Sequence, residues 1–419
     1  MSSYKRETAA LAAGSLVNGV LTYAFFAVTT HALGAEDAAP VSILWAYWSF
    51  AAAALTFPLQ HWVSHSIAAH GGEGQVRAGI VRIAVVVMGA TVATGVVSWL
   101  LRDPLFHRDG VSFPILVAAV TSGSAFIGVV RGALAARDRF TDLAAAVASE
   151  GTVRSLGAVA LLLLDTGGAT AFGIVLFAGQ LVGLAWPTAL RFSRGVERTP
   201  TGSPLAFLGG SAGGQLIGQT ILVGGPVLLT LRGGSPADVT ALFAGLALFR
   251  APYTLALGVL PQLTGRLTTL VVDGRRAALR RVRVTIVALT VVSLPPVAVL
   301  AAWLGPWLIR WMFGASVRLD VLPTTLIALG STVAMSNLVA TITVMAQDRV
   351  GALLRAWITG AVAAAVCVLV IDVPRLEQTC WAFVAAEAVA FVVLVLEEAR
   401  GTAGLVPADP DRRGEADGS

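Results

Sequence analysis

Long, uninterrupted apolar segments recur along almost the entire chain, and this feature constrains its fold more than any other. Most are about 20 residues or longer, which at about 1.5 Å per residue is enough for a helix to cross a hydrocarbon core of ~30 Å. They are continuous in Ala, Leu and Val and lack the alternation of barrel strands. Because backbone groups inside a bilayer must bond within their own segment, the sequence predicts an all-α polytopic membrane protein.

Periodicity and length together predict twelve transmembrane spans joined by mostly short connections. The predicted spans cover residues 8–32, 40–63, 80–100, 111–134, 141–164, 169–190, 207–231, 240–264, 284–308, 319–345, 352–372 and 378–399. Composition agrees, because 56% of the 419 residues are hydrophobic and only 13% are charged. A soluble enzyme of this length could not build a polar surface from so few charged residues.

The distribution of basic residues predicts the orientation in the membrane. With the amino terminus inside, 21 of the 29 Lys and Arg residues face the cytoplasm, six face outward and two lie within spans. Short cytoplasmic loops carry such an excess. We therefore predict a multi-pass protein of the inner (cytoplasmic) membrane with both termini in the cytoplasm. The net charge of +5 does not indicate nucleic-acid binding, since the basic residues are divided among short loops.

The sequence shows no sign of an enzyme or a metal site. The two cysteines, Cys367 and Cys380, both lie within apolar spans, which excludes a disulfide framework or a metal cluster. No HExxH, GxSxG, paired-acid or P-loop pattern occurs. A membrane-embedded glycan polymerase or ligase would need a long external loop for its catalytic residues, and every predicted external loop is short.

The second half of the chain repeats the first at a drifting offset. The matches are Gly14–Ser15 with Gly210–Ser211, Pro58 with Pro261, and Asp138–Arg139 with Asp348–Arg349. They occur in order and at the same depth, which predicts an N-lobe of six spans at 1–195 and a C-lobe of six spans at 196–400. Six is even, so the pseudo-two-fold axis runs along the membrane normal. Residues 401–419 are predicted to be a disordered cytoplasmic tail.

Two passages resemble a known group of transporters. They are GALAARDRFTDLAAAVASEGTVRSLGAVALLLL at residues 132–164 and LFRAPYTLALGVLPQL at residues 248–263. With the 6 + 6 layout, they are similar to the polysaccharide and lipid-linked oligosaccharide flippases of the multidrug/oligosaccharidyl-lipid/polysaccharide exporter superfamily. The resemblance implies outward flipping of a glycan carried on an undecaprenyl-type lipid pyrophosphate, by rocking of two lobes. The chain departs from the fourteen-helix peptidoglycan-precursor flippases by having twelve predicted spans.

Ionisable residues at membrane depth are the main candidate site residues, because each costs about 2.5 to 3.5 kcal/mol at a helix centre. Glu150 and Arg154 lie four residues apart on one helical face. They are either an internal ion pair or a site in which Arg154 binds pyrophosphate and Glu150 orients it. Arg250 has no acid within four positions and precedes Pro252 by two residues. It either binds substrate or pairs with an acid on another helix, such as Glu387.

Further candidates are weaker. Glu387 is a packing or partner residue, or carries the coupling ion. Asn18, Gln215 and Gln219 fall on the first spans of the two lobes, which border the cavity in the superfamily that the chain resembles. Interhelical hydrogen bonding explains these three polar residues equally well.

The sequence therefore predicts a non-enzymatic flippase for lipid-linked oligosaccharide or polysaccharide precursors in cell-envelope glycan synthesis. A cation-coupled multidrug exporter of the same superfamily and a non-transporting scaffold for glycan assembly are the alternatives. We expect a monomer that contacts the lipid-linked glycan, membrane lipids and glycan-assembly enzymes. Without a nucleotide motif or cofactor, transport would draw on an H⁺ or Na⁺ gradient, the membrane potential or consumption of the product.

Overall fold

A computed structural model describes residues 2–70, 73–193, 216–257, 260–347 and 349–404. It is helical almost throughout, and none of these residues forms a β-strand. The N-terminal helices are α1 (Ser2–Asp37), α2 (Ala39–Ala51), α3 (Phe57–His70), α4 (Gly74–Leu100), α5 (Arg102–Phe106), α6 (Ser112–Ala136), α7 (Phe140–Leu163) and α8 (Ala169–Ala178). The C-terminal helices are α10 (Gly225–Leu231), α11 (Pro236–Leu257), α12 (Leu260–Val272), α13 (Arg276–Phe313), α14 (Val321–Ala346), α15 (Val350–Val370) and α16 (Arg375–Gly404).

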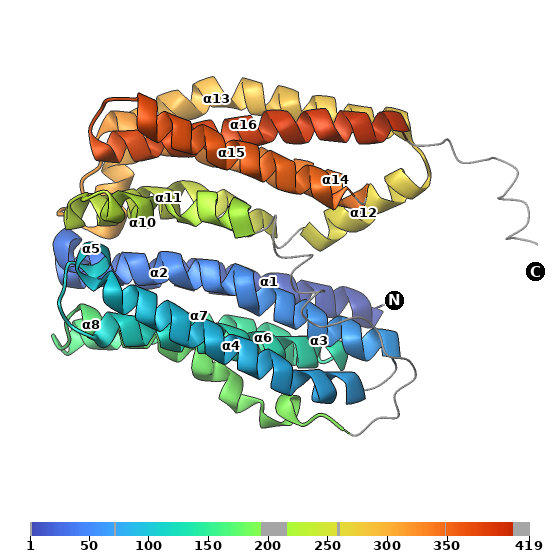
Figure 1. The fold of residues 1–419 in the computed structure, drawn as a ribbon, viewed down its shortest axis with the longest axis horizontal. Helices are drawn as coiled ribbons and strands as arrows, with labels where there is room; N and C mark the ends of the chain where they lie inside the picture. The colour runs from blue at the N-terminus through green and yellow to red at the C-terminus, as the bar shows by residue number, and fades with distance from the viewer. Residues whose placement is uncertain (1, 71–72, 194–215, 258–259, 348, 405–419) are drawn as a thin grey trace, which may run out of the picture.

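The helices form two lobes that lie one above the other in Figure 1. Helices α1 to α8 make up the N-terminal lobe, and α10 to α16 make up the C-terminal lobe. The lobes touch through α1 against α11 and α13, α2 against α10 and α11, and α5 against α10. The two-lobe, all-α architecture predicted from the sequence is confirmed.

Nine helices in the described part of the chain are long and apolar enough to cross a membrane. They correspond to predicted spans 1 to 5 and 9 to 12. Their outward faces carry large exposed apolar side chains, such as Val85 at 67% and Leu369 at 84% exposure. Apolar side chains on these outward faces fit a lipid environment, so the chain is a multi-pass membrane protein.

Several helix ends differ from the predicted spans. Predicted span 2 consists of α2, a π-helical turn at Ala52–Thr56 and α3, with Thr56 donating to the Ser124 carbonyl at 2.8 Å. Predicted span 6 is α-helical only over α8 and continues as 3₁₀ turns at Gly179–Ala185 and Pro187–Leu190. Periodicity alone does not separate these narrower or wider turns from α-helix.

The C-terminal half differs in the same way. Predicted span 8 corresponds to α11, which ends at Leu257, and the last residues of that span, from Leu260 on, belong to helix α12. Predicted span 7 begins outside the described residues, and its described part is helical at 216–223 and again in α10. The predicted boundary at 195 and 196 also lies outside them. Helix α16 runs to Gly404, so its last four residues, predicted as the start of a disordered tail, are helical.

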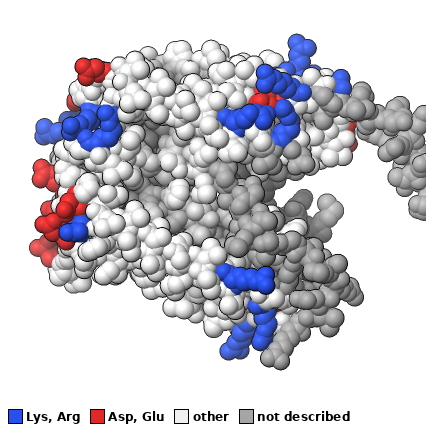
Figure 2. Space-filling model, in the orientation of Figure 1, with Lys and Arg blue, Asp and Glu red and all other residues white. Residues whose placement is uncertain are grey.

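The predicted orientation can be tested by cysteine labelling. Basic side chains gather on both lobes at the end nearest the termini, whereas most of the visible acidic side chains lie at the opposite end (Figure 2). We expect a membrane-impermeant maleimide to label Glu36→Cys in intact cells but not Pro410→Cys, in a background in which Cys367 and Cys380 are replaced. Labelling of position 410 and not of position 36 would reverse the topology.

Candidate functional site between the lobes

An aromatic cluster joins the two lobes at the end opposite the termini. Phe26 and Trp45 come from the N-terminal lobe, and Phe243 and Phe313 come from the C-terminal lobe. Ring centroids lie 4.7 Å apart for Phe26 and Phe243, 5.4 Å for Phe26 and Phe313, and 5.8 Å for Trp45 and Phe243. Tilted and edge-on contacts at these separations are favourable. We call these four residues the aromatic seal.

The sequence pattern alone does not reveal the aromatic seal. Its members lie on four different helices, and each reads as an ordinary apolar residue within a span. Only the packing of α1 and α2 against α11 and α13 brings them together. At the other end of the molecule, the described helices α3 and α12 make no extensive contact with the opposite lobe. The lobes are therefore closed at one end and apart at the end near the termini.

Arg250 lies on α11 where this helix meets α1. It is half-buried, and one terminal nitrogen donates to the Leu222 carbonyl at 2.8 Å. Its Nε is buried and has no hydrogen-bond partner among the described residues. On the facing helix, the Tyr23 hydroxyl lies 3.3 Å from the Thr254 hydroxyl, which links the two lobes one turn beyond Arg250.

Arg250 forms no ion pair with any residue that the structure describes. In this conformation Arg250 therefore does not pair directly with Glu387, which was the alternative interpretation. A half-buried guanidinium at membrane depth, without an acidic partner among the described residues, is a candidate contact for an anionic ligand.

Glu387 is 1% exposed and is held by Asn337 on α14. The Asn337 amide nitrogen donates to a Glu387 carboxyl oxygen at 2.7 Å and to the Glu387 carbonyl at 2.9 Å. The second carboxyl oxygen of Glu387 and the side-chain oxygen of Asn337 have no partner among the described residues. This arrangement suits a carboxyl group that gains and loses a proton inside the C-terminal lobe.

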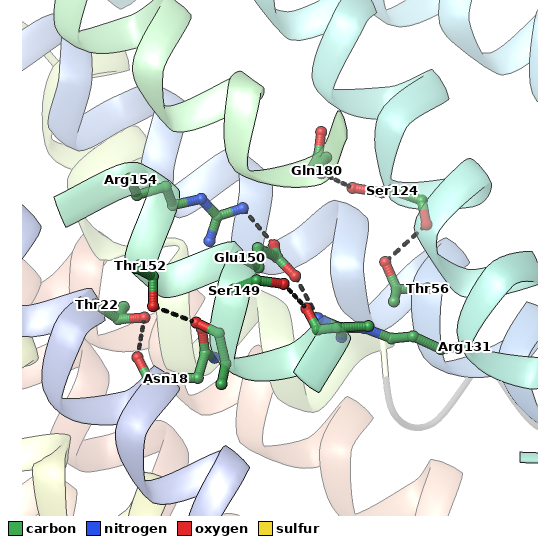
Figure 3. Close-up of polar contacts among 12 residues, drawn as sticks. Asn18, Thr22, Thr56, Ser124, Arg131, Ser149, Glu150, Thr152, Arg154 and Gln180 are labelled. Atoms are coloured by element: carbon green, nitrogen blue, oxygen red, sulfur yellow. Dashed lines mark hydrogen bonds and ion pairs between the residues drawn. The ribbon is translucent and has the colours of Figure 1, made fainter. Parts of the chain in front are cut away.

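Glu150 is shared by two arginines within the N-terminal lobe (Figure 3). Arg154 and Arg131 each donate to one of its carboxyl oxygens. Arg154 is completely buried, donates from Nε to the Leu176 carbonyl at 2.9 Å, and stacks over the Trp48 ring at 4.1 Å. In this conformation its planar donor group is directed into the lobe, which favours the internal ion pair of the two readings of Arg154.

The third member of this group, Arg131, was not expected there. Its position near the end of a predicted span indicates a side chain that extends to the membrane surface. The structure instead buries it to 8% exposure against Glu150. The three residues carry a net charge of +1 inside the lobe. No sequence signal marks this pairing, because Arg131 and Glu150 lie on different helices, 19 positions apart.

The predicted polar candidates lie at separate places. Asn18 lies where α1 packs on α7, next to Gly151, and its side-chain oxygen has no described partner. Gln219 is half-buried in the helical residues 216–223, and Gln215 lies outside the described residues. The structure therefore does not bring Asn18 together with Arg250 and Glu387.

A further polar cluster joins α6 to neighbouring segments. The Gln180 side-chain amide lies 2.7 Å from the Ser124 hydroxyl, next to the Thr56 bond to the same serine (Figure 3). All three side chains are buried. Hydrogen bonds of this kind hold membrane helices together, and we assign the cluster to packing of the N-terminal lobe.

Comparison with known proteins defines the fold. No protein-family profile matches the sequence, and no curated protein matches it. Solved structures do match. An inward-facing multidrug resistance transporter of the MATE family, in the MOP superfamily, gives a TM-score of 0.70 at 12% identity, over 93% of this chain and 95% of that one. An outward-facing structure of a MATE family multidrug transporter gives 0.59 at 12% identity, over 97% of both chains.

A third structure is a MOP superfamily transporter from Pyrococcus furiosus, described as having reversed polarity of its binding pocket. It gives a TM-score of 0.60 at 13% identity and covers 96% of both chains. These likenesses show that the chain has the two-lobe, twelve-helix fold of MOP superfamily transporters. At 12 to 13% identity they show the fold alone, and they do not include the glycan-lipid flippases that the sequence resembles.

Proposed function

We propose that this protein is a membrane transporter that works by alternating access between its two lobes. The observation that carries the proposal is the asymmetry of the lobe contact, with the aromatic seal at one end and no extensive contact between the described helices of the two lobes at the other. The higher TM-score against the inward-facing structure than against the outward-facing one agrees with this asymmetry. Rocking that separates the seal would open that end and close the end near the termini.

The charged residues favour a substrate with an anionic headgroup. At membrane depth, Arg131 and Arg154 share the single acid Glu150, and Arg250 at the junction of the lobes has no ion-pair partner among the described residues. An arginine fork suits phosphate and pyrophosphate oxygens. We therefore propose outward flipping of a lipid-linked, pyrophosphate-bearing oligosaccharide or polysaccharide precursor in the inner membrane, with Arg250 as the headgroup contact.

A cation-coupled multidrug exporter is the second candidate. The names of the similar structures favour it, since those structures are described as multidrug transporters. The unpartnered oxygen of Glu387 also supports it, because a carboxyl of this kind could carry the coupling H⁺ or Na⁺. Its prediction for substrate is opposite: a cationic drug requires an acidic cavity, whereas Glu387 is buried behind Asn337.

Cross-linking the aromatic seal tests alternating access for either substrate. We expect Phe26→Cys with Phe243→Cys, in a background lacking Cys367 and Cys380, to lose transport when a short dithiol-reactive linker is added. Reducing a cleavable linker should restore transport. Each single cysteine variant with the same linker is the control and should keep its activity. Full transport by the cross-linked protein would show that the seal does not open and would contradict the proposed mechanism.

A further inference from the structure

An arginine-rich corner lies at the end of the C-terminal lobe nearest the termini, where α12 turns into α13 (Figure 1). Leu263, Leu267 and Leu270 of α12 pack with Leu279 and Ile342 of α13 and α14. The chain then reverses at Gly274, whose φ of 61° lies in the left-handed region. This packing fixes the start of α13, and with it the basic residues that follow the turn.

Three of these residues form one stripe on α13. Arg276, Arg280 and Arg283 are spaced by four and three positions, so they share a helix face. Arg276 and Arg280 are exposed, and neither makes an ion pair or side-chain hydrogen bond with a residue that the structure describes. Arg283 is held at 2.8 Å by Glu398, whose other oxygen accepts from Thr402 at 2.6 Å. The stripe therefore presents two guanidinium groups without a neutralising acid, next to Arg283, which Glu398 holds in place.

Arg283, at the end of the stripe, also borders an apolar crevice between α13, α14 and α16. Val282, Ile286, Ala340 and Val395 line it, with the Arg283–Glu398 pair also at its wall. Two positive side chains next to an apolar slot match an amphiphile with a negative head and a hydrocarbon chain. Basic side chains are visible at this end of the lobe in Figure 2.

We propose that the α12–α13 corner is a binding site for an anionic phospholipid of the surrounding leaflet. Arg276 and Arg280 hold the phosphate headgroup, and an acyl chain packs across the apolar mouth of the crevice beside Ile286. The occupant is a resident lipid, because the site lies within one lobe and away from the contact between lobes. The inference is independent of which substrate the protein transports.

Thermal stability of the purified full-length protein in neutral detergent measures this binding. We expect dioleoylphosphatidylglycerol to raise the melting temperature in a saturable manner. Arg276→Gln with Arg280→Gln should raise the half-saturating lipid concentration about thirtyfold, which corresponds to a loss of about 1 kcal/mol of binding free energy per arginine near the surface. Ile286→Trp, which fills the crevice without changing charge, should also weaken binding.

A control of equal charge comes from the same corner. Arg275 and Arg281 are exposed, but Arg275 precedes the helix, and Arg281 lies about 100° or more around the helix from each residue of the stripe. Arg275→Gln with Arg281→Gln should therefore leave lipid binding unchanged. Equal weakening by both pairs would show only general attraction to a basic surface. Equal stabilisation by dioleoylphosphatidylcholine or by inorganic phosphate would likewise overturn the site.

Discussion

Arg250→Ala is expected to abolish transport while the protein still folds and inserts. Arg250 has no ion-pair partner among the described residues, so its removal strands no buried acid. The lost interactions are one hydrogen bond to the Leu222 carbonyl and the donors available to an anionic headgroup. A proteoliposome assay with a fluorescent polyprenyl-pyrophosphate-linked sugar measures the loss, and detergent melting measures the fold.

Two variants make this prediction specific. Arg250→Lys should restore transport only in part, because an ammonium keeps the charge and loses the planar fork. Arg310→Ala, an exposed arginine whose Nε contacts only the carbonyl of Pro306 on its own helix, should transport normally. Full flipping by Arg250→Ala would remove the anionic-substrate site. Loss of cationic dye efflux in Glu387→Gln, with Arg250→Ala unaffected, would favour the multidrug alternative.

Glu150→Ala is expected to destabilise the N-terminal lobe more than replacement of either arginine. Glu150 neutralises both Arg131 and Arg154, and Arg154 is fully buried. Removing the carboxylate leaves two cations uncompensated, whereas Arg154→Ala leaves Glu150 paired with Arg131. Breaking a buried pair in this way costs about 3 to 5 kcal/mol. Melting of the purified variants, compared by tryptophan fluorescence, ranks these costs.

The double variant Glu150→Ala with Arg154→Ala separates the roles of this group. It should recover part of the lost stability, because one unpaired cation is removed, but Arg131 remains without its acid. If the group is structural, the double variant should also recover transport in proportion to its stability. A double variant that is stable and inactive would instead assign substrate binding to Arg154. Equal melting of Glu150→Ala and the native protein would contradict the shared-carboxylate arrangement.

The candidate site was partly predictable because burying a charge is costly wherever it occurs. An ionisable residue inside an apolar run stands out without any structure, and Arg250, Arg154, Glu150 and Glu387 were identified in this way. The partners of these residues were not identified from the sequence. Arg131 pairs with Glu150, and Asn337 holds Glu387, across helices whose relative rotation the sequence does not encode locally. The aromatic seal was missed for the same reason.

Sequence by itself determined that the chain is helical and membrane-spanning, where most spans lie, and that they divide into two lobes. These properties follow from length, hydrophobicity and repetition, which are local or additive along the chain. The tertiary structure decided that Arg154 faces into its lobe, that Arg250 has no acidic partner among the described residues, and that Phe26 contacts Phe243. Each depends on which faces of distant helices pack together, and in an apolar span every face looks alike until packing selects one.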